Sequence, residues 1–516
     1  MQNGNPADRC PHPHREPGQA GLKIWYSSLL VGFASLIWFL IRTGPKPYRA
    51  AYPCQKTALA NATALLGTLG LPALLPRPVG LARAEALRRG SISWRFLLFA
   101  LAAAALAVPA VQTVRRPPTP FFQSAGFAGA AAGGPPAAQA LLPPLSEQRL
   151  AAGTFSDIYA VQGTTGADAG FQRLIEQMES RGQSFYALFD RGDVLILKVN
   201  SQWDERGGTN TDLVKAIIEG ILRHPDGFTG EIVIADNGQG QYGAAGSGGS
   251  LDWKNNNAVD RTQSMRRVAE QFTDKHKVST VEWDRFTSTR VAEYNQGDPR
   301  DGYILHPSPS PDTGIILSYP KFTTRYGTAI SFKMGVWNPE LGRYDSDRLK
   351  VINIPVLKSH SIYGVTACLK HYMGVVSDKL SRHTAHRSVG TGGMGTQMAE
   401  TRFPVLNVLD AIWINAHPGR GPRTSYAQAT QTNLIAASRD PVALDYWAAK
   451  NILLPAARKL GYSSADSLDP DSAREGSFGR WLRLSMAALQ RAGYPVTLDL
   501  ERVNITVSSL DNFRLE

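Results

Sequence analysis

Residues 351–374 read VINIPVLKSHSIYGVTACLKHYMG. The first part is an apolar run typical of a buried strand, and it ends at Lys358 and His360. A second basic pair, Lys370 and His371, follows about three helical turns later. This stretch therefore predicts that groups able to hold anions or move protons come from the end of one strand and the start of its neighbour.

From about residue 150 onwards, strand-like and helix-like patterns alternate. Expected strands are short apolar runs at 194–199, 231–235, 278–283, 351–357 and 434–436. Expected helices have apolar residues every three to four positions, at 171–178, 212–222, 263–272, 405–414 and 441–453. The alternation predicts an α/β fold with a mostly parallel sheet and helices on both faces. The segment 300–345 has an antiparallel pattern and predicts an insertion.

Polar side chains follow four of these strands. They are Lys198 and Asn200, Asp236, Lys358 and His360, and Arg439 and Asp440. Ligands of such sheets bind beyond the carboxyl ends of the strands, so these residues predict a shared cleft. The alternative is that each one caps a helix or meets solvent.

The residue types in this cleft suit an anionic ligand. Lys358 and His360 are two apart, so an extended chain points both the same way. A lysine can hold a carboxylate or phosphate while an imidazole moves a proton near neutral pH. The alternative is a surface lysine beside a structural histidine. The candidate catalytic residues are His360, Lys358, Lys370 and His371, and the candidate ligand-binding residues are Lys198, Asn200, Asp236, Thr366, Arg439, Asp440 and Asp445.

Cofactor motifs are weak. His383 and His386 have a spacing that could hold a divalent metal, but Arg382 and Arg387 flank them and no acidic residue lies between Asp378 and Glu400. Two Gly-x-Gly-x-x-Gly matches start at residues 238 and 390. The first follows a strand but opens no amphipathic helix, and the second has no strand before it, so neither fits a dinucleotide site. The chain has 3 cysteines and no Cys-x-x-Cys, so it shows no internal iron–sulfur motif.

Residues 1–123 predict a membrane module. They contain 14 Lys or Arg against 3 Asp or Glu, whereas residues 124–516 contain 41 against 40. The apolar runs 24–41 and 96–111 predict transmembrane helices, and 58–75 predicts an interfacial stretch or a third crossing. An internal signal sequence beginning near residue 88 is the alternative. The near neutrality of the remaining chain argues against a nucleic-acid partner.

The basic residues between 77 and 95 predict a cytoplasmic loop. The chain after residue 111 then emerges on the far side, which predicts an extracytoplasmic globular domain at the inner membrane. Residues 124–149 are rich in Ala, Gly and Pro and predict a flexible linker. Residues 150–516 would form the α/β domain.

Several motifs together resemble the microbial family named domain of unknown function 362, over roughly residues 190–455. The motifs are LILKVN at 195–200, PVLKSH at 355–360, GVTACLK at 364–370 with Gly374, SRDPVALD at 438–445, and Asp410 with GRGP at 419–422. The segment 42–55 looks like a membrane leader that some members carry. Other members carry ferredoxin modules, for which this chain lacks cysteines, and His371 stands where the family commonly has Asn. The resemblance implies a fold and a site but no activity.

Three functions follow as expectations. The first is a membrane-anchored enzyme that acts on a small anionic substrate, with Asp236, Asp440 and Asp445 orienting the bases or holding a divalent metal. The second is a non-catalytic binding or assembly module of the cell envelope. The third is a redox-associated protein that works with a separate iron–sulfur partner.

Overall fold

The computed structural model describes residues 142–143, 145–148, 156–239 and 248–510. The chain divides into two compact units, Met1–Ala131 and Ala132–Glu516. The predicted membrane segments 24–41, 58–75 and 96–111 lie outside the described residues, as does most of the predicted linker. No helix in the described part is long and apolar enough to cross a membrane.

The described part of the second unit is built on a ten-stranded sheet. Eight strands follow the order β15-β1-β14-β13-β10-β2-β3-β4, while β11 pairs with β13 and β12. The strands are β1 (Ser156–Gln162), β2 (Val194–Lys198), β3 (Glu231–Asp236), β4 (Lys277–Glu282), β10 (Leu349–Asn353), β11 (Val356–His360), β12 (Gly364–Thr366), β13 (Leu406–Asn415), β14 (Thr430–Ser438) and β15 (Val503–Ser509).

The sheet is mixed, so the expectation of a mostly parallel sheet was wrong. Strands β2, β3, β4, β10 and β13 run parallel, but β14 is antiparallel to both of its neighbours, β13 and β1. The expected helix at 405–414 is in fact strand β13. Its apolar residues Val405, Val408, Leu409 and Ile412 follow helical spacing, but a strand buried on both faces also has a nearly continuous apolar run.

A second sheet of five strands lies between β4 and β10 in the sequence. The strand order is β5-β6-β7-β8-β9, and each strand is antiparallel to the next. The strands are β5 (Gly302–Leu305), β6 (Ser318–Thr323), β7 (Ala329–Ser331), β8 (Gly335–Asn338) and β9 (Arg343–Asp345).

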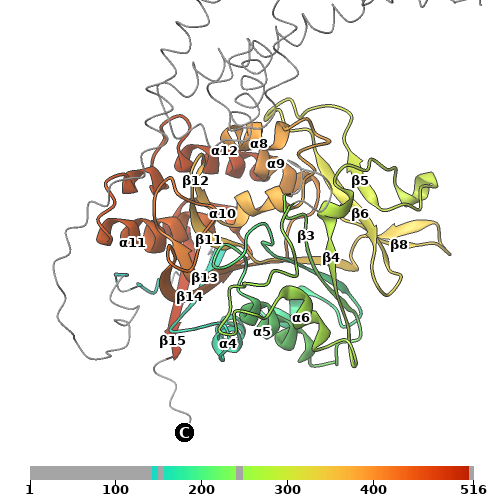
Figure 1. Ribbon diagram of the computed structural model, residues 1–516, viewed down its shortest axis with the longest axis horizontal. Helices are drawn as coiled ribbons and strands as arrows, with labels where there is room; N and C mark the ends of the chain where they lie inside the picture. Colours follow the sequence, from blue (N-terminus) through green and yellow to red (C-terminus); the bar gives the residue numbers. More distant parts are fainter. Residues whose placement is uncertain (1–141, 144, 149–155, 240–247, 511–516) are drawn as a thin grey trace, which may run out of the picture. The chain divides into compact units, whose positions relative to one another are not determined.

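Helices cover the main sheet on both faces (Figure 1). One layer is α4 (Gly170–Ser180), α5 (Thr211–Leu222) and α6 (Met265–Glu270). The other is α7 (Cys368–His371), α8 (Thr384–Ser388), α9 (Gly393–Glu400), α10 (Pro441–Ala448), α11 (Leu454–Lys459) and α12 (Phe478–Arg491). Short helical turns are η5 (Phe185–Leu188), η7 (Trp283–Phe286), η8 (Tyr294–Gln296), η9 (Tyr372–Gly374), η10 (Val389–Thr391), the π-helical turn η11 (Ala449–Leu453), η12 (Ala465–Leu468) and η13 (Leu500–Arg502).

Alternate side chains of the central strands enter two separate cores. In β2, Val194 and Ile196 pack with the layer of α7 to α12, whereas Leu195 and Leu197 pack with α4 to α6. This alternation follows from the two-residue period of a strand. Burial on both faces explains why these strands are uninterrupted apolar runs that end in polar residues only where the sheet ends.

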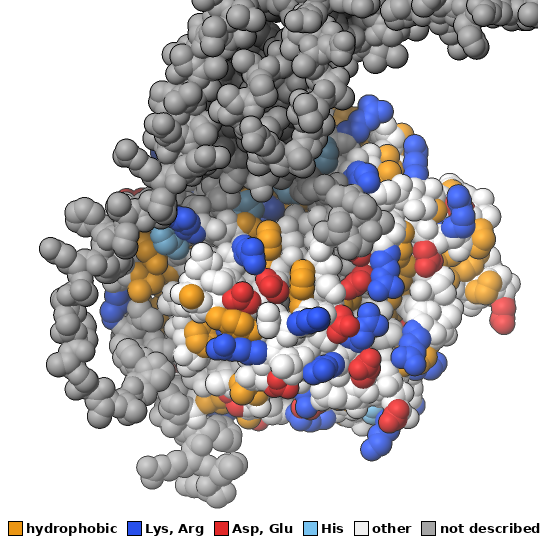
Figure 2. Space-filling model, viewed as in Figure 1, with side chains coloured by type: hydrophobic (Ala, Val, Ile, Leu, Met, Phe, Trp, Pro, Cys, Tyr) orange, Lys and Arg blue, Asp and Glu red, His pale blue; other side chains and the backbone are white. Residues whose placement is uncertain are grey.

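The surface charge of the domain is mixed. The face seen in Figure 2 carries Lys and Arg side chains interspersed with Asp and Glu. This pattern agrees with the near balance of charges in residues 124–516.

Candidate functional site

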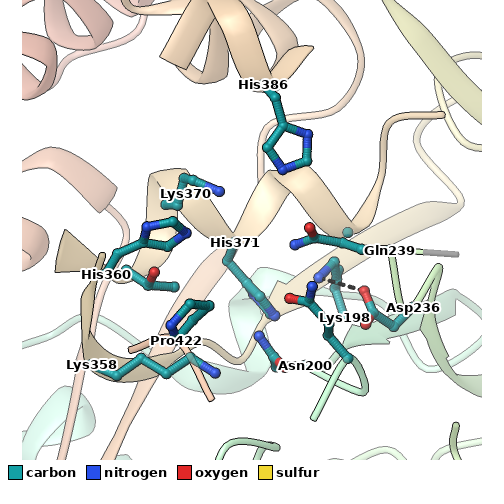
Figure 3. Close-up of a pocket in the computed structure, with 13 residues that line it drawn as sticks. Lys198, Asn200, Asp236, Gln239, Lys358, His360, Lys370, His371, His386 and Pro422 are labelled. Atoms are coloured by element: carbon teal, nitrogen blue, oxygen red, sulfur yellow. Dashed lines mark ion pairs between the residues drawn. The ribbon is translucent and has the colours of Figure 1, made fainter. Parts of the chain in front are cut away.

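A pocket of about 160 Å³ lies at the carboxyl ends of β2, β3 and β11, beside β12 and α7 (Figure 3). We name it the lysine–histidine pocket. Its lining residues are Lys198, Asn200, Gln202, Asp236, Gln239, Lys358, His360, Thr366, Lys370, His371, Gly374, His386 and Pro422. The structure thus brings together all four candidate catalytic residues and four of the seven candidate ligand-binding residues, Lys198, Asn200, Asp236 and Thr366.

Lys198 and Asp236 form a buried ion pair at the ends of neighbouring strands, with Nζ 2.8 Å from Oδ1. Lys198 Nζ also donates to the Val199 carbonyl. The other carboxylate oxygen of Asp236 accepts hydrogen bonds from the Ser201 backbone and hydroxyl, each 2.9 Å long. Burial lowers the pKa of Lys198, and the Asp236 carboxylate acts against this. The pair forms a fixed polar wall of the pocket.

Gly374 lets η9 approach this ion pair closely. A Cβ at this position would collide with Asp236 Oδ1 and with Lys198 Nζ. Both atoms belong to fully buried side chains that have little room to shift. Glycine is therefore required here by space, since its φ is not in the left-handed region.

Lys358 is fully buried and donates a hydrogen bond to the Gly207 carbonyl. Burial lowers its pKa to about 7, and the charges of Asp410 and Asp236 act against this. Asp410 is buried as well, and burial raises its pKa to about 6, opposed by hydrogen bonds from the Asn210 and Ile412 amides. Lys358 thus has only a partial counter-charge.

Lys370 has fewer contacts to other polar groups. Its side chain is buried. No described residue accepts a hydrogen bond from Nζ, and none forms an ion pair with it. The ammonium lies 5.0 Å from the centre of the Tyr363 ring. Burial lowers the pKa of Lys370 to about 7, with the Asp378 charge acting against it. This amine is therefore available to a ligand.

The tautomer of His371 is set by Asn353 at the end of β10. The Asn353 amide nitrogen donates to the Cys368 carbonyl and to Asn407, so its oxygen is the atom that faces His371 Nδ1 at 2.8 Å. Nδ1 therefore carries the proton. His371 Nε2 is buried and makes no hydrogen bond with the described residues. Burial, with Lys198 and Lys358 nearby, holds the pKa of His371 well below its usual range.

His360 has the opposite tautomer. Its Nδ1 accepts hydrogen bonds from the Ile362 and Tyr363 amides, 3.1 and 3.3 Å long. The proton of the neutral ring is therefore on Nε2. Burial, and next the charge of Lys370, hold the pKa of His360 well below its usual range. The pocket thus contains one imidazole set up as a donor and one set up as an acceptor.

His386 enters the pocket from α8 (Figure 3). Its Nδ1 lies 2.8 Å from Asp378, and Nδ1 of His383 lies 2.9 Å from the same carboxylate oxygen. Burial acts to raise the pKa of Asp378, but hydrogen bonds from both rings outweigh this and lower the pKa to about 2. In the described part of the chain, no group of three or more His, Cys, Asp or Glu side chains could hold a metal ion. The metal interpretation of His383 and His386 therefore gains no support.

Asp445 lies behind the pocket. Its carboxylate accepts hydrogen bonds from the Cys368 and Leu369 amides, 2.7 and 3.0 Å long, at the start of α7. Burial raises its pKa to about 7. Asp445 therefore positions the helix that carries Lys370 and His371, rather than lining the pocket as expected.

The prediction that Arg439 and Asp440 share the cleft was wrong. They follow β14, which runs antiparallel to β13, so its carboxyl end lies at the opposite edge of the sheet. There they line another cavity, of about 380 Å³, together with Asp157 and Tyr159. Asp440 caps α10 by accepting from the Val442 and Ala443 amides. The direction of one strand explains the error.

Three pocket residues were not anticipated: Gln202, Gln239 and Pro422. Gln202 and Gln239 stand a few residues beyond the ends of β2 and β3, so a wider window after each strand would have included them. Pro422 belongs to the GRGP motif, which was linked to the family but not to a place in the fold. Two polar atoms in the pocket, Asn200 Oδ1 and Thr366 Oγ1, are buried without a hydrogen-bond partner among the described residues.

The charge balance of the pocket favours an anion. Three lysines line it, against the single carboxylate of Asp236. Burying unpaired ammonium groups is costly, and a bound anion with several oxygens would compensate for that cost. The unpartnered donors and acceptors around it could then hydrogen-bond the rest of a small ligand.

The fold and pocket define a mixed α/β domain with a buried pocket that three lysines line. Residues 344–450 match the family described as "Domain of unknown function (DUF362)", which confirms the resemblance inferred from the sequence. The matched segment includes Lys358, His360, Lys370 and His371 from the pocket.

One relative is the thylakoid-associated protein of Synechocystis sp., which is 36% identical over 101 residues. The alignment covers 19% of this chain and 30% of that protein. The chain therefore spans less than a third of the relative's length at this similarity. No solved structure matches the chain.

Proposed function

We propose that the protein is an enzyme that binds a small anionic substrate in the lysine–histidine pocket and transfers a proton to or from it. The observation that carries this proposal is the burial of Lys198, Lys358 and Lys370 around one cavity with a single lining carboxylate. A carboxylate or phosphate group on the substrate would supply the missing negative charge.

Anion binding would fall mainly to Lys358 and Lys370. Lys198 already has Asp236 as a partner at 2.8 Å, whereas the other two have no ion pair among the described residues. A hydrogen bond from a charged donor contributes about 1.5–3 kcal/mol. Two such bonds would fix the orientation of a substrate small enough for a pocket of about 160 Å³.

Proton transfer would fall to the two imidazoles. His371 lines the pocket, and its Nε2 carries the lone pair because Asn353 holds the proton at Nδ1. It can therefore accept a proton from a substrate carbon or oxygen. His360, protonated at Nε2, can donate a hydrogen bond to an oxygen on which charge develops.

Solvent isotope exchange would test this function. The purified full-length chain is incubated in D₂O with a panel of small carboxylates and phosphates, and deuterium incorporation is followed by NMR. We expect exchange into at least one compound, reduced about 10²- to 10⁴-fold by His371→Gln. His306→Gln is the matched control, because His306 is exposed and lies outside the pocket.

Two other results would contradict an enzymatic role. Binding without exchange or turnover for any compound would favour the binding or assembly module of the cell envelope. Equal loss of activity in His371→Gln and His306→Gln would show that His371 has no specific role.

We also propose that residues 1–123 tether this domain to the inner membrane, with the domain on the extracytoplasmic side. The proposal is supported by the apolar runs 24–41 and 96–111 and by the basic loop between them. The name of the thylakoid-associated relative is compatible with a membrane location. Deleting residues 1–123 should release the protein from membrane fractions, and retention of the shortened chain would contradict the tether.

A further inference from the structure

The three lysines of the pocket differ in how their amines are held. Lys198 Nζ is fixed by Asp236 at 2.8 Å and by the Val199 carbonyl at 3.0 Å. Lys358 Nζ donates to the Gly207 carbonyl. Lys370 Nζ has neither a hydrogen bond nor an ion pair with a described residue, and its neighbour is the face of the Tyr363 ring.

An amine in such surroundings is suited to nucleophilic attack. An unprotonated lysine carries a lone pair on nitrogen, and desolvation in a pocket favours that neutral form. Lys370 is buried on α7, whose start is fixed by the two hydrogen bonds to Asp445. The amine is thus held in place by its helix while its reactive atom faces the cavity (Figure 3).

We propose that Lys370 forms an imine with the aldehyde or ketone carbonyl of a small oxo acid bound in the pocket. This inference rests on the proposed function, because the carboxylate of the oxo acid would occupy the anion site, held by Lys358, while Lys370 in its neutral form faces the carbonyl. To the proposed function, the inference adds the class of the substrate and the covalent bond that Lys370 forms with it.

The step balances without an oxidant or reductant. The lone pair of Lys370 Nζ attacks the carbonyl carbon and forms a C–N bond, the carbonyl π electrons move to oxygen, and one amine proton passes from nitrogen to that oxygen. The C–O bond of the resulting carbinolamine then breaks as the C=N bond forms, and the hydroxyl leaves as water with the second amine proton. One amine and one carbonyl thus give one imine and one water.

His360 is placed to assist this step. Its Nε2 carries the proton, since Nδ1 accepts from two backbone amides. Lys370 and His360 line the same pocket (Figure 3). A hydrogen bond from Nε2 to the carbinolamine oxygen would favour its departure as water.

Reductive trapping tests the inference. The full-length protein is incubated at pH 7 with glyoxylate and cyanoborohydride, which reduces an imine to a stable secondary amine, and the modified lysine is located by peptide mass spectrometry. We expect the Lys370 peptide to be labelled at least about tenfold faster than peptides with solvent-exposed lysines such as Lys254, because desolvation in the pocket favours the neutral amine. Sulfate should protect Lys370, and propionaldehyde, which lacks a carboxylate, should label it much more slowly.

Two variants complete the test. Lys370→Arg keeps the positive charge but should lose the fast label, whereas Lys254→Arg should keep it. Mapping the unaltered protein gives an answer even if Lys370→Arg fails to fold. Fast labelling of Lys358 instead, or labelling of Lys370 no faster than of Lys254, would overturn the inference. If sulfate binds the pocket but glyoxylate leaves Lys370 unlabelled, the imine is excluded while the proposed anion site stands.

Discussion

The two edges of the main sheet carry similar residue types in different settings. At one edge, Lys198 and Asp236 end parallel strands and face a pocket in which three lysines are buried. At the other edge, Arg439 and Asp440 follow the antiparallel strand β14. Asp440 caps a helix, and Arg439 is exposed.

The difference shows that strand direction decides which polar residues can act together. Parallel strands bring their ends to one edge, so residues far apart in the chain share one cavity. A buried lysine also interacts with a ligand in a low-dielectric setting, whereas an exposed arginine is screened by water. The same charge should therefore stabilise a bound anion more strongly at the pocket edge.

The largest contrast should appear in stability. Asp236→Asn leaves Lys198 buried without its counter-charge, so we expect it to lower the free energy of unfolding by about 3–5 kcal/mol. Asp440→Asn keeps the cap of α10 but turns its amide nitrogen towards the Thr497 N–H, which donates to Asp440 Oδ2, so it should cost about 1–3 kcal/mol. Urea unfolding of both variants measures the difference, and similar losses would remove the distinction between the two edges.

A smaller contrast should appear in anion affinity. Lys358→Met keeps the length and volume of a fully buried side chain but removes its charge, so we expect sulfate to bind roughly 10- to 100-fold more weakly. Arg439→Met should leave the affinity unchanged. Calorimetric titration with sulfate decides this. A loss in Arg439→Met alone would move the anion site to the opposite edge.

The smallest contrast concerns pH. Burial lowers the pKa of Lys358 and of Lys370 to about 7, so both are mostly charged below pH 7 and mostly neutral above it. Sulfate keeps its two negative charges across this range, so its effect on the melting temperature should be full below pH 7 and should fall as the pH rises further. Without sulfate, these two groups make the folded state more stable as the pH rises, which is the opposite trend. Their lowered pKa makes folding release protons, so their contribution to stability increases with pH between about 7 and 10.5. A sulfate effect that is constant with pH would point to arginine instead.

Much of the pocket could be predicted from the sequence because strand ends are easy to recognise. An uninterrupted apolar run such as 194–197 must be buried on both faces, so the first charged residue after it marks the edge of the sheet. Lys198, Asp236, Lys358 and His360 were located in this way. Lys370 and His371 were predicted from their position about three helical turns after Lys358 and His360.

The errors arose where the sequence does not show whether a segment is a strand or in which direction that strand runs. The apolar run 405–414 fits both a helix and a doubly buried strand, and the pairing of β13 with β10, β11 and β14 settles which it is. The structure pairs β14 antiparallel to this strand, which places Arg439 and Asp440 away from the lysine–histidine pocket. The role of Asp445 was equally hidden, because a buried carboxylate that holds a helix start looks the same in sequence as one that binds a ligand.

Crystals of the protein soaked with selenate would test the central claim most directly. Selenate has the charge and shape of sulfate, and its anomalous signal locates it without ambiguity. We expect an anion in the lysine–histidine pocket within hydrogen-bond distance of Lys358 and Lys370 Nζ. An empty pocket at a concentration that fills a site beside Arg439 would contradict the account.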